Sequence, residues 1–231
     1  MLRTLARGLA IDLPGQCEVC RAWPARPVCE ACVARFAQPR PRCRRCALPV
    51  PEGVLECGQC LRHPPALSAC HAAVSYGYPW STLIARFKFQ GQPGLAGTLA
   101  LLLRSAPWVE PAIDGADLVL PMPLSATRLA ERGYNQAQEL ARRLAPGKAD
   151  PSLLVRLLEV PPQVGQDRES RLASVQHAFA VAPLSVDQLR GRKLLLVDDV
   201  MTTGASLFSA AGVLRRAGAA EVSAVVLART D

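Results

Sequence analysis

KLLLVDDVMTTGASL, residues 193–207, is the stretch that decides the fold of this chain. An apolar strand, predicted over Lys193 to Val197, leads through two acids into a loop of small residues that opens a helix at Ser206. Ligands of open α/β sheets lie at the carboxyl ends of the strands, so a binding site is expected at this junction. Strands alternate with helices through the rest of the chain, which favours an α/β fold with a parallel sheet wound in the Rossmann manner.

The loop after the strand has the residue types that hold a phosphate. Thr202, Thr203, Gly204 and Ser206 place backbone N–H groups and hydroxyls at a helix N-terminus. Unpaired donors and the helix dipole attract an anion there. The glycine-rich fingerprints of NTPases and of dinucleotide-binding proteins are absent from the sequence. The simpler alternative is that the threonines only cap the helix.

Two adjacent acids precede the loop, and we expect both to turn toward a ligand because the strand ends there. Carboxylates beside a phosphate loop would hold hydroxyls or Mg²⁺. Together the acids and the loop predict recognition of ribose 5-phosphate. We therefore predict Asp198 and Asp199 as catalytic residues and the following residues as binders of the sugar phosphate: Val200, Met201, Thr202, Thr203, Gly204, Ala205 and Ser206.

Cysteine spacing predicts a metal module. Of the 9 cysteines, all but Cys70 form C-x-x-C pairs, which are Cys17 with Cys20, Cys29 with Cys32, Cys43 with Cys46, and Cys57 with Cys60. Each pair makes a knuckle, and two knuckles complete the tetrahedron that zinc prefers. We expect one or two structural Zn²⁺ ions, with consecutive and cross-braced pairing both open. An iron–sulfur cluster is the main alternative, and a redox motif is the weaker one.

The segment around the cysteines is rich in Pro and Arg and has little apolar periodicity, so the metal must supply its folding free energy. We place a zinc-binding module at residues 1–70 and the α/β domain at residues 71–231. Elsewhere the pattern predicts a strand within AAVSYGYPW, helices broken at Gly91 to Gly94, a strand from Leu118, a helix over Leu129 to Leu144, a strand at 153–158, a loop over Pro161 to Ser174, a helix over Ser206 to Ala217 and a strand over Glu221 to Leu227.

The formal net charge is +8, and nearly all of the positive charge is arginine. Arginine forks suit phosphate groups, so anionic partners gain weight. Arg40, Arg42, Arg44 and Arg45 surround the third knuckle and are candidates for DNA phosphates, although arginines that only solvate a small metal module explain them equally well. With neither a secretory signal nor an apolar run that could span a membrane in the sequence, we expect a cytoplasmic protein.

The chain closely resembles the ComF family of competence-associated, amidophosphoribosyltransferase-like proteins, which includes GntX-type proteins. The resemblance rests on an ordered set of motifs over nearly the whole length. These are the paired cysteine knuckles, KFQG at Lys88 to Gly91, the Pro-x-Pro strand end at Pro121 to Pro123, RGYNQA at Arg132 to Ala137, and VDDVMTTGAS at Val197 to Ser206.

The resemblance implies a type I phosphoribosyltransferase-like domain that binds 5-phosphoribosyl 1-diphosphate with Mg²⁺. It implies that the segment Pro121 to Arg132 holds the diphosphate and that Pro161 to Ser174 closes over the site. The implied diphosphate-binding residues are Arg128, Arg132, Gln163, Arg168 and Arg171. Family members usually show Thr near Val160 and Asn near Ser174, so this chain departs from them in the closing segment.

Three functions are consistent with these features. The resemblance favours a factor for DNA uptake in natural transformation, with single-stranded DNA and the competence machinery as partners. The first alternative is an active phosphoribosyltransferase, a glycosyltransferase in reaction class, of unknown acceptor. The second is a sensor of phosphoribosyl metabolites that does not bind nucleic acid.

Overall fold

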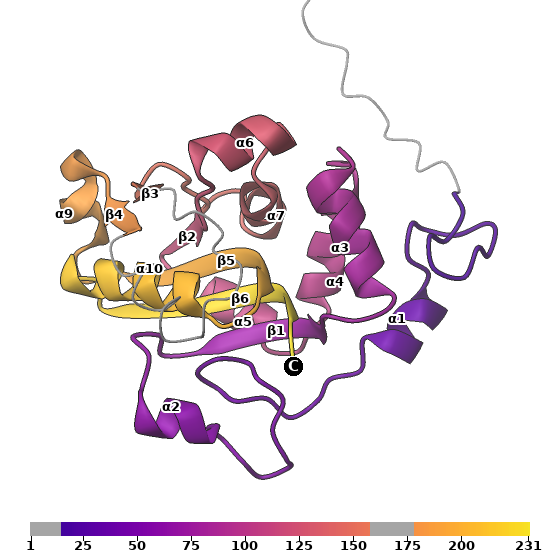
Figure 1. Cartoon of the computed structure of the whole chain (residues 1–231), viewed down its shortest axis with the longest axis horizontal. Coiled ribbons are helices and arrows are strands. Elements are labelled where there is room, and N and C mark those ends of the chain that lie inside the picture. Colours follow the sequence, from indigo (N-terminus) through magenta and orange to yellow (C-terminus); the bar gives the residue numbers. More distant parts are fainter. Residues whose placement is uncertain (1–14, 158–177) are drawn as a thin grey trace, which may run out of the picture.

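Four parallel strands form the sheet that positions the site. The computed structural model describes residues 15–157 and 178–231. The strand order is β1-β6-β5-β2, and every neighbouring pair is parallel (Figure 1). The strands are β1 Cys70–Ser75, β2 Leu118–Pro121, β5 Lys193–Met201 and β6 Glu221–Arg229. The predicted α/β class and parallel sheet are confirmed.

Helices cover both faces of this sheet. Leu195 and Val197 of β5 enter the apolar core on one face, whereas Leu194 and Leu196 enter the core on the other. This alternation follows from the two-residue period of a strand. The first face packs against α3 Trp80–Phe89, α4 Leu95–Arg104, α5 Val109–Asp114 and α7 Gln136–Leu144, and the second packs against α10 Ala205–Arg216.

The carboxyl ends of all four strands lie at one edge of the sheet because the strands are parallel. Ser75, Pro121, Met201 and Arg229 end the strands at this edge. The loop from Thr202 to Gly204 follows β5 there, and α10 begins directly after it. The predicted junction of strand, loop and helix is therefore present at the edge where ligands bind in such sheets.

Three predicted boundaries were wrong, and one of them is the strand expected over Glu221 to Leu227, which continues to Arg229. The strand expected to end at Val197 continues to Met201, because β6 runs on to Arg229 and pairs with it throughout. The single helix expected over Leu129 to Leu144 is two helices, α6 Ala126–Arg132 and α7. Gly133 ends α6 with a φ of 75°, and the side chain of Asn135 caps α7 by accepting the N–H of Gln138.

The remaining elements are short. The strand expected at 153–158 is β3 Leu154–Arg156, which pairs antiparallel with β4 Phe179–Val181. The other short elements are α1 Glu30–Phe36, α2 Gly58–Arg62, a 3₁₀ turn at Pro183–Ser185 and α9 Val186–Leu189. The loop predicted over Pro161 to Ser174 lies outside the described residues. Within the described ranges, no helix is both long and apolar enough to cross a bilayer.

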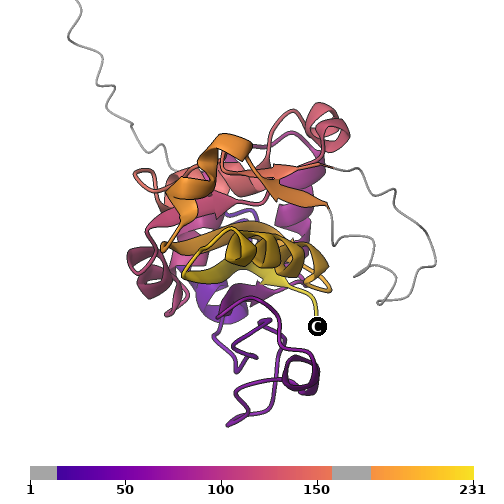
Figure 2. The ribbon, with the colours of Figure 1, turned by 90° about the vertical axis from the view of Figure 1, so that its left-hand side faces the viewer.

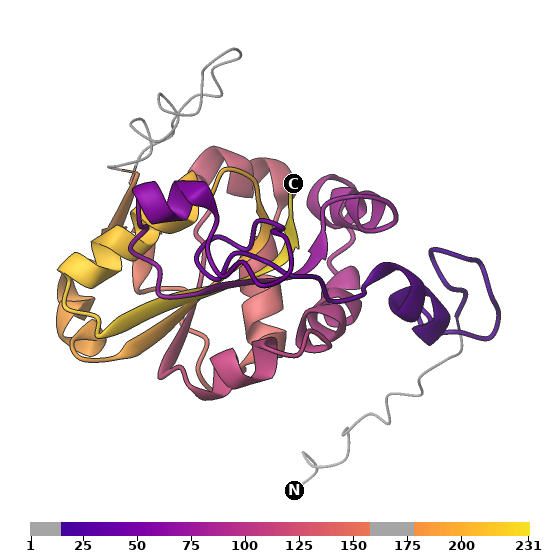
Figure 3. The same cartoon turned by 90° about the horizontal axis from the view of Figure 1, so that it is seen from below.

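The cysteine-rich segment runs along the rest of the protein. Figure 2 shows its purple part, which carries α2, below the gold unit of β5, α10 and β6. Seen from below in Figure 3, α1 lies apart from α2 and at the side of the molecule where α3 and α4 lie. The indole Nε1 of Trp80 donates to the carbonyl of Phe36 at 2.9 Å, which fixes α1 to α3. The division of the chain at residue 70 stays a prediction.

Two glycine substitutions test the break between α6 and α7. Gly133→Ala should lower the free energy of unfolding by about 1 kcal/mol, because a side chain is strained at positive φ. Gly97→Ala, inside α4, should raise it by up to about 1 kcal/mol, because alanine favours helix and its Cβ would lie 4.0 Å from the nearest atom. Urea unfolding of both variants checks the signs, and a stabilising Gly133→Ala would contradict the observed break.

Candidate functional site

Gly204 shapes the loop after β5. Its φ is 85°, a conformation that favours glycine. A Cβ at this position would lie 2.7 Å from Cζ of Phe208 and would also collide with the methyl group of Met201. The positive φ therefore favours glycine here, and any side chain would force the ends of Met201 and Phe208 to shift. The chain turns tightly from the strand into α10.

The turn leaves backbone donors that no described residue accepts. The N–H of Phe208 donates to the carbonyl of Gly204 at 2.9 Å, and the N–H of Ala205 lies 3.4 Å from Oγ1 of Thr203. Within the described part of the chain, no acceptor takes the N–H groups of Thr203, Gly204, Ser206 and Leu207. Because α10 is 12 residues long, its dipole adds to these donors, and the loop can hold an anion.

The two acids lie within the last part of β5 rather than beyond its end. Asp199 is only 5% exposed, and its Oδ1 forms an ion pair with Nζ of Lys88 at 2.8 Å. Asp198 is half-buried, and its Oδ1 accepts the N–H of Asp199 at 2.8 Å. The acids are thus held at the carboxyl edge of the sheet, directly before the loop.

Lys88 was not among the predicted site residues. It lies in the last turn of α3, more than a hundred residues from Asp199 in the sequence, and the fold brings the two together. A signal was present, since Lys88 is one of three lysines in the chain and begins the KFQG motif. The apolar pattern of the helix did not identify Lys88 as a site residue, because Lys88 lies between Phe87 and Phe89.

Burial and like charge raise the pKa of Asp198 to about 7. Burial has the largest effect, and the charge of Asp199 adds to it. The Lys88 ammonium and the N–H of Asp199 oppose the rise in this pKa. A carboxyl group with a pKa near neutrality can carry a proton, and it gains stabilisation from any cation or hydroxyl donor that approaches it.

The predicted arginines of α6 are on the surface, since no residue of that helix is buried. Arg132 donates to Oε1 of Gln136 at 3.0 Å and lies over the ring of Phe89, 5.1 Å from its centroid. Arg128 is exposed. The structure therefore does not bring either arginine into contact with Asp198 or Asp199. Arg171, with Gln163 and Arg168, lies outside the described residues.

The RGYNQA motif fixes the loop that follows β2. The amide Nδ2 of Asn135 donates to the carbonyl of Met122 at 3.0 Å, and the hydroxyl of Tyr134 donates to the carbonyl of Phe87. These bonds connect α7 to the end of β2 and to α3. The motif thus holds together the elements that carry Lys88 and the segment from Pro121 to Arg132.

The cysteines form two groups by consecutive pairing, so cross-braced pairing is excluded. The first group is Cys17, Cys20, Cys29 and Cys32, and the second is Cys43, Cys46, Cys57 and Cys60. Within each group the sulfurs lie within 4.8 Å of one another. A tetrahedron with Zn–S bonds of about 2.3 Å requires sulfurs about 3.8 Å apart. The Sγ pairs Cys17–Cys32, Cys20–Cys29 and Cys46–Cys57 are 3.8, 3.6 and 3.7 Å apart. Both groups fit a single zinc ion. They are too tight for a four-iron cluster, whose cysteines bind separate iron atoms.

Backbone N–H groups favour the thiolate at Cys17, whereas burial raises the pKa of Cys32 and Cys60. The N–H of Cys29 points at Sγ of Cys17, 3.4 Å away. Burial alone would raise the pKa of Cys17, but N–H groups of Cys20, Cys29 and Val19 lower it to about 6. In each group four sulfurs would fill every coordination position, which leaves no site for a reactant. The chemistry of the two groups is therefore structural.

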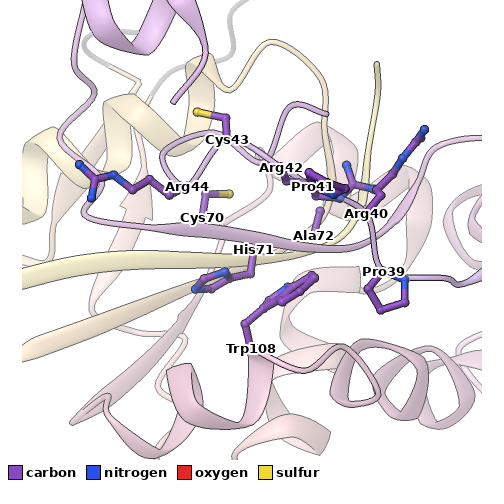
Figure 4. Close-up of a pocket in the computed structure, with 10 residues that line it drawn as sticks. All are labelled: Pro39, Arg40, Pro41, Arg42, Cys43, Arg44, Cys70, His71, Ala72 and Trp108. Atoms are coloured by element: carbon purple, nitrogen blue, oxygen red, sulfur yellow. The ribbon is translucent and has the colours of Figure 1, made fainter. Parts of the chain in front are cut away.

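A cavity of about 440 Å³ lies between the third knuckle and β1 (Figure 4). Arg40, Arg42 and Arg44 line one side, and the rings of His71 and Trp108, with centroids 6.3 Å apart, line the other. Arg40 and Arg42 both donate to Oγ of Ser75, at 2.9 and 3.1 Å. The wall is apolar and aromatic, and the rim is cationic.

The four candidate arginines for DNA are not equivalent. Arg45 and Arg44 share the carboxylate of Glu56, and Arg45 also donates to the carbonyl of Leu67 at 3.0 Å. Arg42 donates to the carbonyl of Ala47 at 3.0 Å. Arg42 and Arg45 therefore hold the knuckle together. Arg40 and Arg44, whose side chains are 49% and 58% exposed, are the two that can reach an outside anion.

Known families and solved structures match parts of this chain. The family model described as "Phosphoribosyl transferase domain" matches residues 129–231. A solved structure described as the allosteric regulatory enzyme of purine biosynthesis matches 59% of this chain and 25% of its own, with a TM-score of 0.36 and 20% identity.

Two relatives match most of the chain. The "DNA utilization protein YhgH" of Salmonella typhimurium is 30% identical over 229 residues, which cover 95% of this chain and 99% of the relative. The "Competence protein F" of Haemophilus influenzae is 34% identical over 197 residues, which cover 82% of this chain and 85% of the relative. The similarity includes the cysteine-rich segment as well as the sheet.

The raised pKa of Asp198 predicts a pH dependence of stability. Between its ordinary value of 3.8 and about 7, the folded state keeps a proton that the unfolded chain has lost. Stability should therefore fall as the pH rises through this window and level off above it. Asp198→Asn cannot ionise, so it should flatten the slope and exceed wild type at about pH 8 by on the order of 2 kcal/mol.

Urea unfolding of zinc-loaded, Mg²⁺-free Asp198→Asn and wild type at about pH 5 and pH 8 measures this difference. Asp187→Asn is the matched control, because the side chain of Asp187 is 94% exposed. A slope in Asp198→Asn equal to that of wild type would show that another group carries the pH dependence.

Proposed function

The chain belongs to the ComF family, and from this membership we propose that it binds 5-phosphoribosyl 1-diphosphate as part of a role in DNA utilization. The family match and the phosphoribosyltransferase-type domain support the first half, and the names of the relatives support the second. The observation that carries the proposal is the set of free N–H groups at the start of α10, directly after Asp198 and Asp199.

The loop would hold the 5-phosphate. The N–H groups of Thr203, Gly204, Ser206 and Leu207 lie at the helix N-terminus, where they would share the phosphate oxygens. Gly204 lets the backbone approach the ligand, and the hydroxyls of Thr202 and Thr203 would add donors. No side-chain cation is needed, since the dipole of α10 supplies partial positive charge.

The acids would hold the ribose hydroxyls. In the free protein Lys88 neutralises Asp199, so that carboxylate is not left bare in a buried place. Ribose hydroxyls that donate to Asp199 would replace this contact. The Lys88 ammonium would then be free to meet the negative charge of the diphosphate. Mg²⁺, entering with the diphosphate, would offset the remaining charge on ligand and acids.

Catalysis would follow if an acceptor reached the anomeric carbon. Departure of diphosphate leaves positive charge on the ribose, and the carboxylates of Asp198 and Asp199 would stabilise that charge. Arg128, Arg132 and Arg171 are the proposed contacts of the leaving group. A transferase and a metabolite sensor share the ground-state contacts, so release of diphosphate separates them.

We further propose that single-stranded DNA is the nucleic-acid partner and that it binds at the cavity of Figure 4. An apolar pocket walled by His71 and Trp108 suits a stacked base. Arg40 and Arg44 on its rim suit the flanking phosphates. We also propose that residues 1–70 are a zinc module, that residues 71–231 are the phosphoribosyltransferase-like domain, and that the protein acts in the cytoplasm.

Calorimetry with 5-phosphoribosyl 1-diphosphate and Mg²⁺ tests the sugar-phosphate site. Wild type should bind, and Asp199→Asn should weaken binding at least about tenfold, or about 1.4 kcal/mol, because a carboxylate that accepts ribose hydroxyls is lost. Asp187→Asn, far more exposed, should bind as wild type does. Absence of binding by wild type, or equal affinity in Asp199→Asn, would refute the site. Diphosphate in the same samples would indicate turnover.

Fluorescence anisotropy with a labelled single-stranded oligonucleotide tests the nucleic-acid site. The double variant Arg40→Gln and Arg44→Gln should bind about tenfold more weakly, and the slope of log affinity against log salt should fall by roughly 1 to 2. The control carries Arg190→Gln and Arg192→Gln, two exposed arginines near the opposite edge of the sheet. Equal losses in both double variants would mean that only net charge matters.

A further inference from the structure

Arg229 is a buried cation without an acidic partner in the described part of the chain. It ends β6 and is only 4% exposed. Asp231, two residues further on, pairs instead with Arg40 at 3.8 Å. A charge removed from water costs several kcal/mol unless an opposite charge lies close to it. The buried guanidinium of Arg229 therefore needs a nearby negative charge, and no described carboxylate supplies it.

The donors of Arg229 join two functional parts of the molecule. Its Nε donates to the carbonyl of Cys46 at 2.9 Å, which lies within the second cysteine group. Its Nη1 lies 3.3 Å from the carbonyl of Met201, the last residue before the phosphate loop. The same nitrogen donates to the carbonyl of Thr230. One guanidinium thus bridges the metal group and the start of the loop.

Further contacts make this bridge stiff on the loop side. The carbonyl of Met201 also accepts the N–H of Thr230 at 3.1 Å, and the sulfurs of Cys70 and Met201 are 3.6 Å apart. The methyl group of Met201 in turn packs against Gly204. A shift of Met201 would therefore move the residue whose φ makes the turn.

A cavity of about 330 Å³ adjoins the same bridge. Cys46, Cys57 and Cys60 line it from the metal group, Thr202 and Thr203 line it from the loop, and Arg229 lies between them. The metal group and the loop are therefore neighbours, and they share one apolar core that includes Cys46, Cys60 and Met201. Arg229 is the main polar connection across this space.

The two metal groups differ in their surroundings. Near the first group, Arg86 and Arg21 share the carboxylate of Glu18, at 2.7 and 3.4 Å, so their charges are compensated by an acid. Among the described residues, no acid pairs with Arg229 beside the second group. Four thiolates around one Zn²⁺ carry a net charge of about −2, which would supply the missing counter-charge.

We propose that Arg229 is a positioning residue that couples the metal centre of Cys43, Cys46, Cys57 and Cys60 to the phosphate loop. The anionic centre holds the guanidinium, and the guanidinium holds Met201. Loading of this metal centre then sets the geometry of the loop, whereas loading of the first centre does not. The coupling rests on the proposed function only for the identity of the loop's ligand.

Release of zinc to an excess of a chromogenic chelator tests whether the metal centre and the Arg229 guanidinium stabilise each other. In Arg229→Gln, one of the two zinc equivalents should leave at least about tenfold faster than in wild type, and the other should keep its rate. Cys17→Ser, which retains only the second group, assigns the fast equivalent. Arg190→Gln, an exposed arginine, should leave both rates unchanged.

Hydrogen exchange of residues 201–207 tests whether Arg229 holds Met201 and the phosphate loop in place. Exchange should rise in Arg229→Gln and in Cys43→Ser, and it should stay at the wild-type rate in Cys17→Ser. Arg229→Lys keeps the charge but loses the fork, so it should retain zinc while its loop exchanges faster. The affinity for ribose 5-phosphate should fall about tenfold in Arg229→Gln.

Wild-type rates for both zinc equivalents in Arg229→Gln would overturn the proposal, as would unchanged exchange of residues 201–207 in that variant. Should Arg229→Gln fail to fold, the exchange measured on Arg229→Lys decides in its place. If wild type binds no sugar phosphate, the proposed function fails, yet the zinc and exchange measurements still decide the coupling.

Discussion

The parallel pairing of β5 with β6 is the constraint on which the site depends. Its register aligns Asp198 with Val226 and Met201 with Arg229, so the strand remains paired past both acids. The chain can then turn only at Thr202, which places the free N–H groups of the turn just beyond the carboxylates. A shorter β6 would release β5 near Val197, and the acids would lie in a loose loop rather than in a fixed place beside Lys88.

The two cysteine groups hold one continuous segment against two different parts of the sheet domain. The first lies in the same apolar core as Trp80 of α3, and the second lies in the core formed by α10 and by Cys70 of β1. Backbone pairing adds to the second contact, because the N–H of Cys70 donates to the carbonyl of Arg44 at 2.7 Å. Each knuckle pair therefore organises a contact that its own few apolar residues could not sustain.

Local chemistry made much of this site predictable, and distance along the chain concealed the rest. The charge and the small size of the residues from Asp198 to Ser206, at the start of a helix, predict the sugar-phosphate site. The C-x-x-C spacing likewise predicts the metal groups. Lys88 could not be paired with Asp199, because only the sheet brings α3 to the end of β5. The break at Gly133 was hidden by an apolar period that runs through both α6 and α7, and the length of β5 was set by its partner β6.

Net charge has a different meaning once the metal groups are considered. The value of +8 counts every cysteine as neutral. Two zinc centres with four thiolates each would lower it to about +4. Arg42, Arg45 and Arg229 also spend their donors on carbonyls of the protein itself. Much of the arginine content thus offsets internal anions and fixes the knuckles, so the basic composition is weak support for nucleic-acid binding. Arg40 and Arg44 are the arginines available to DNA, because their side chains are exposed beside an aromatic cavity.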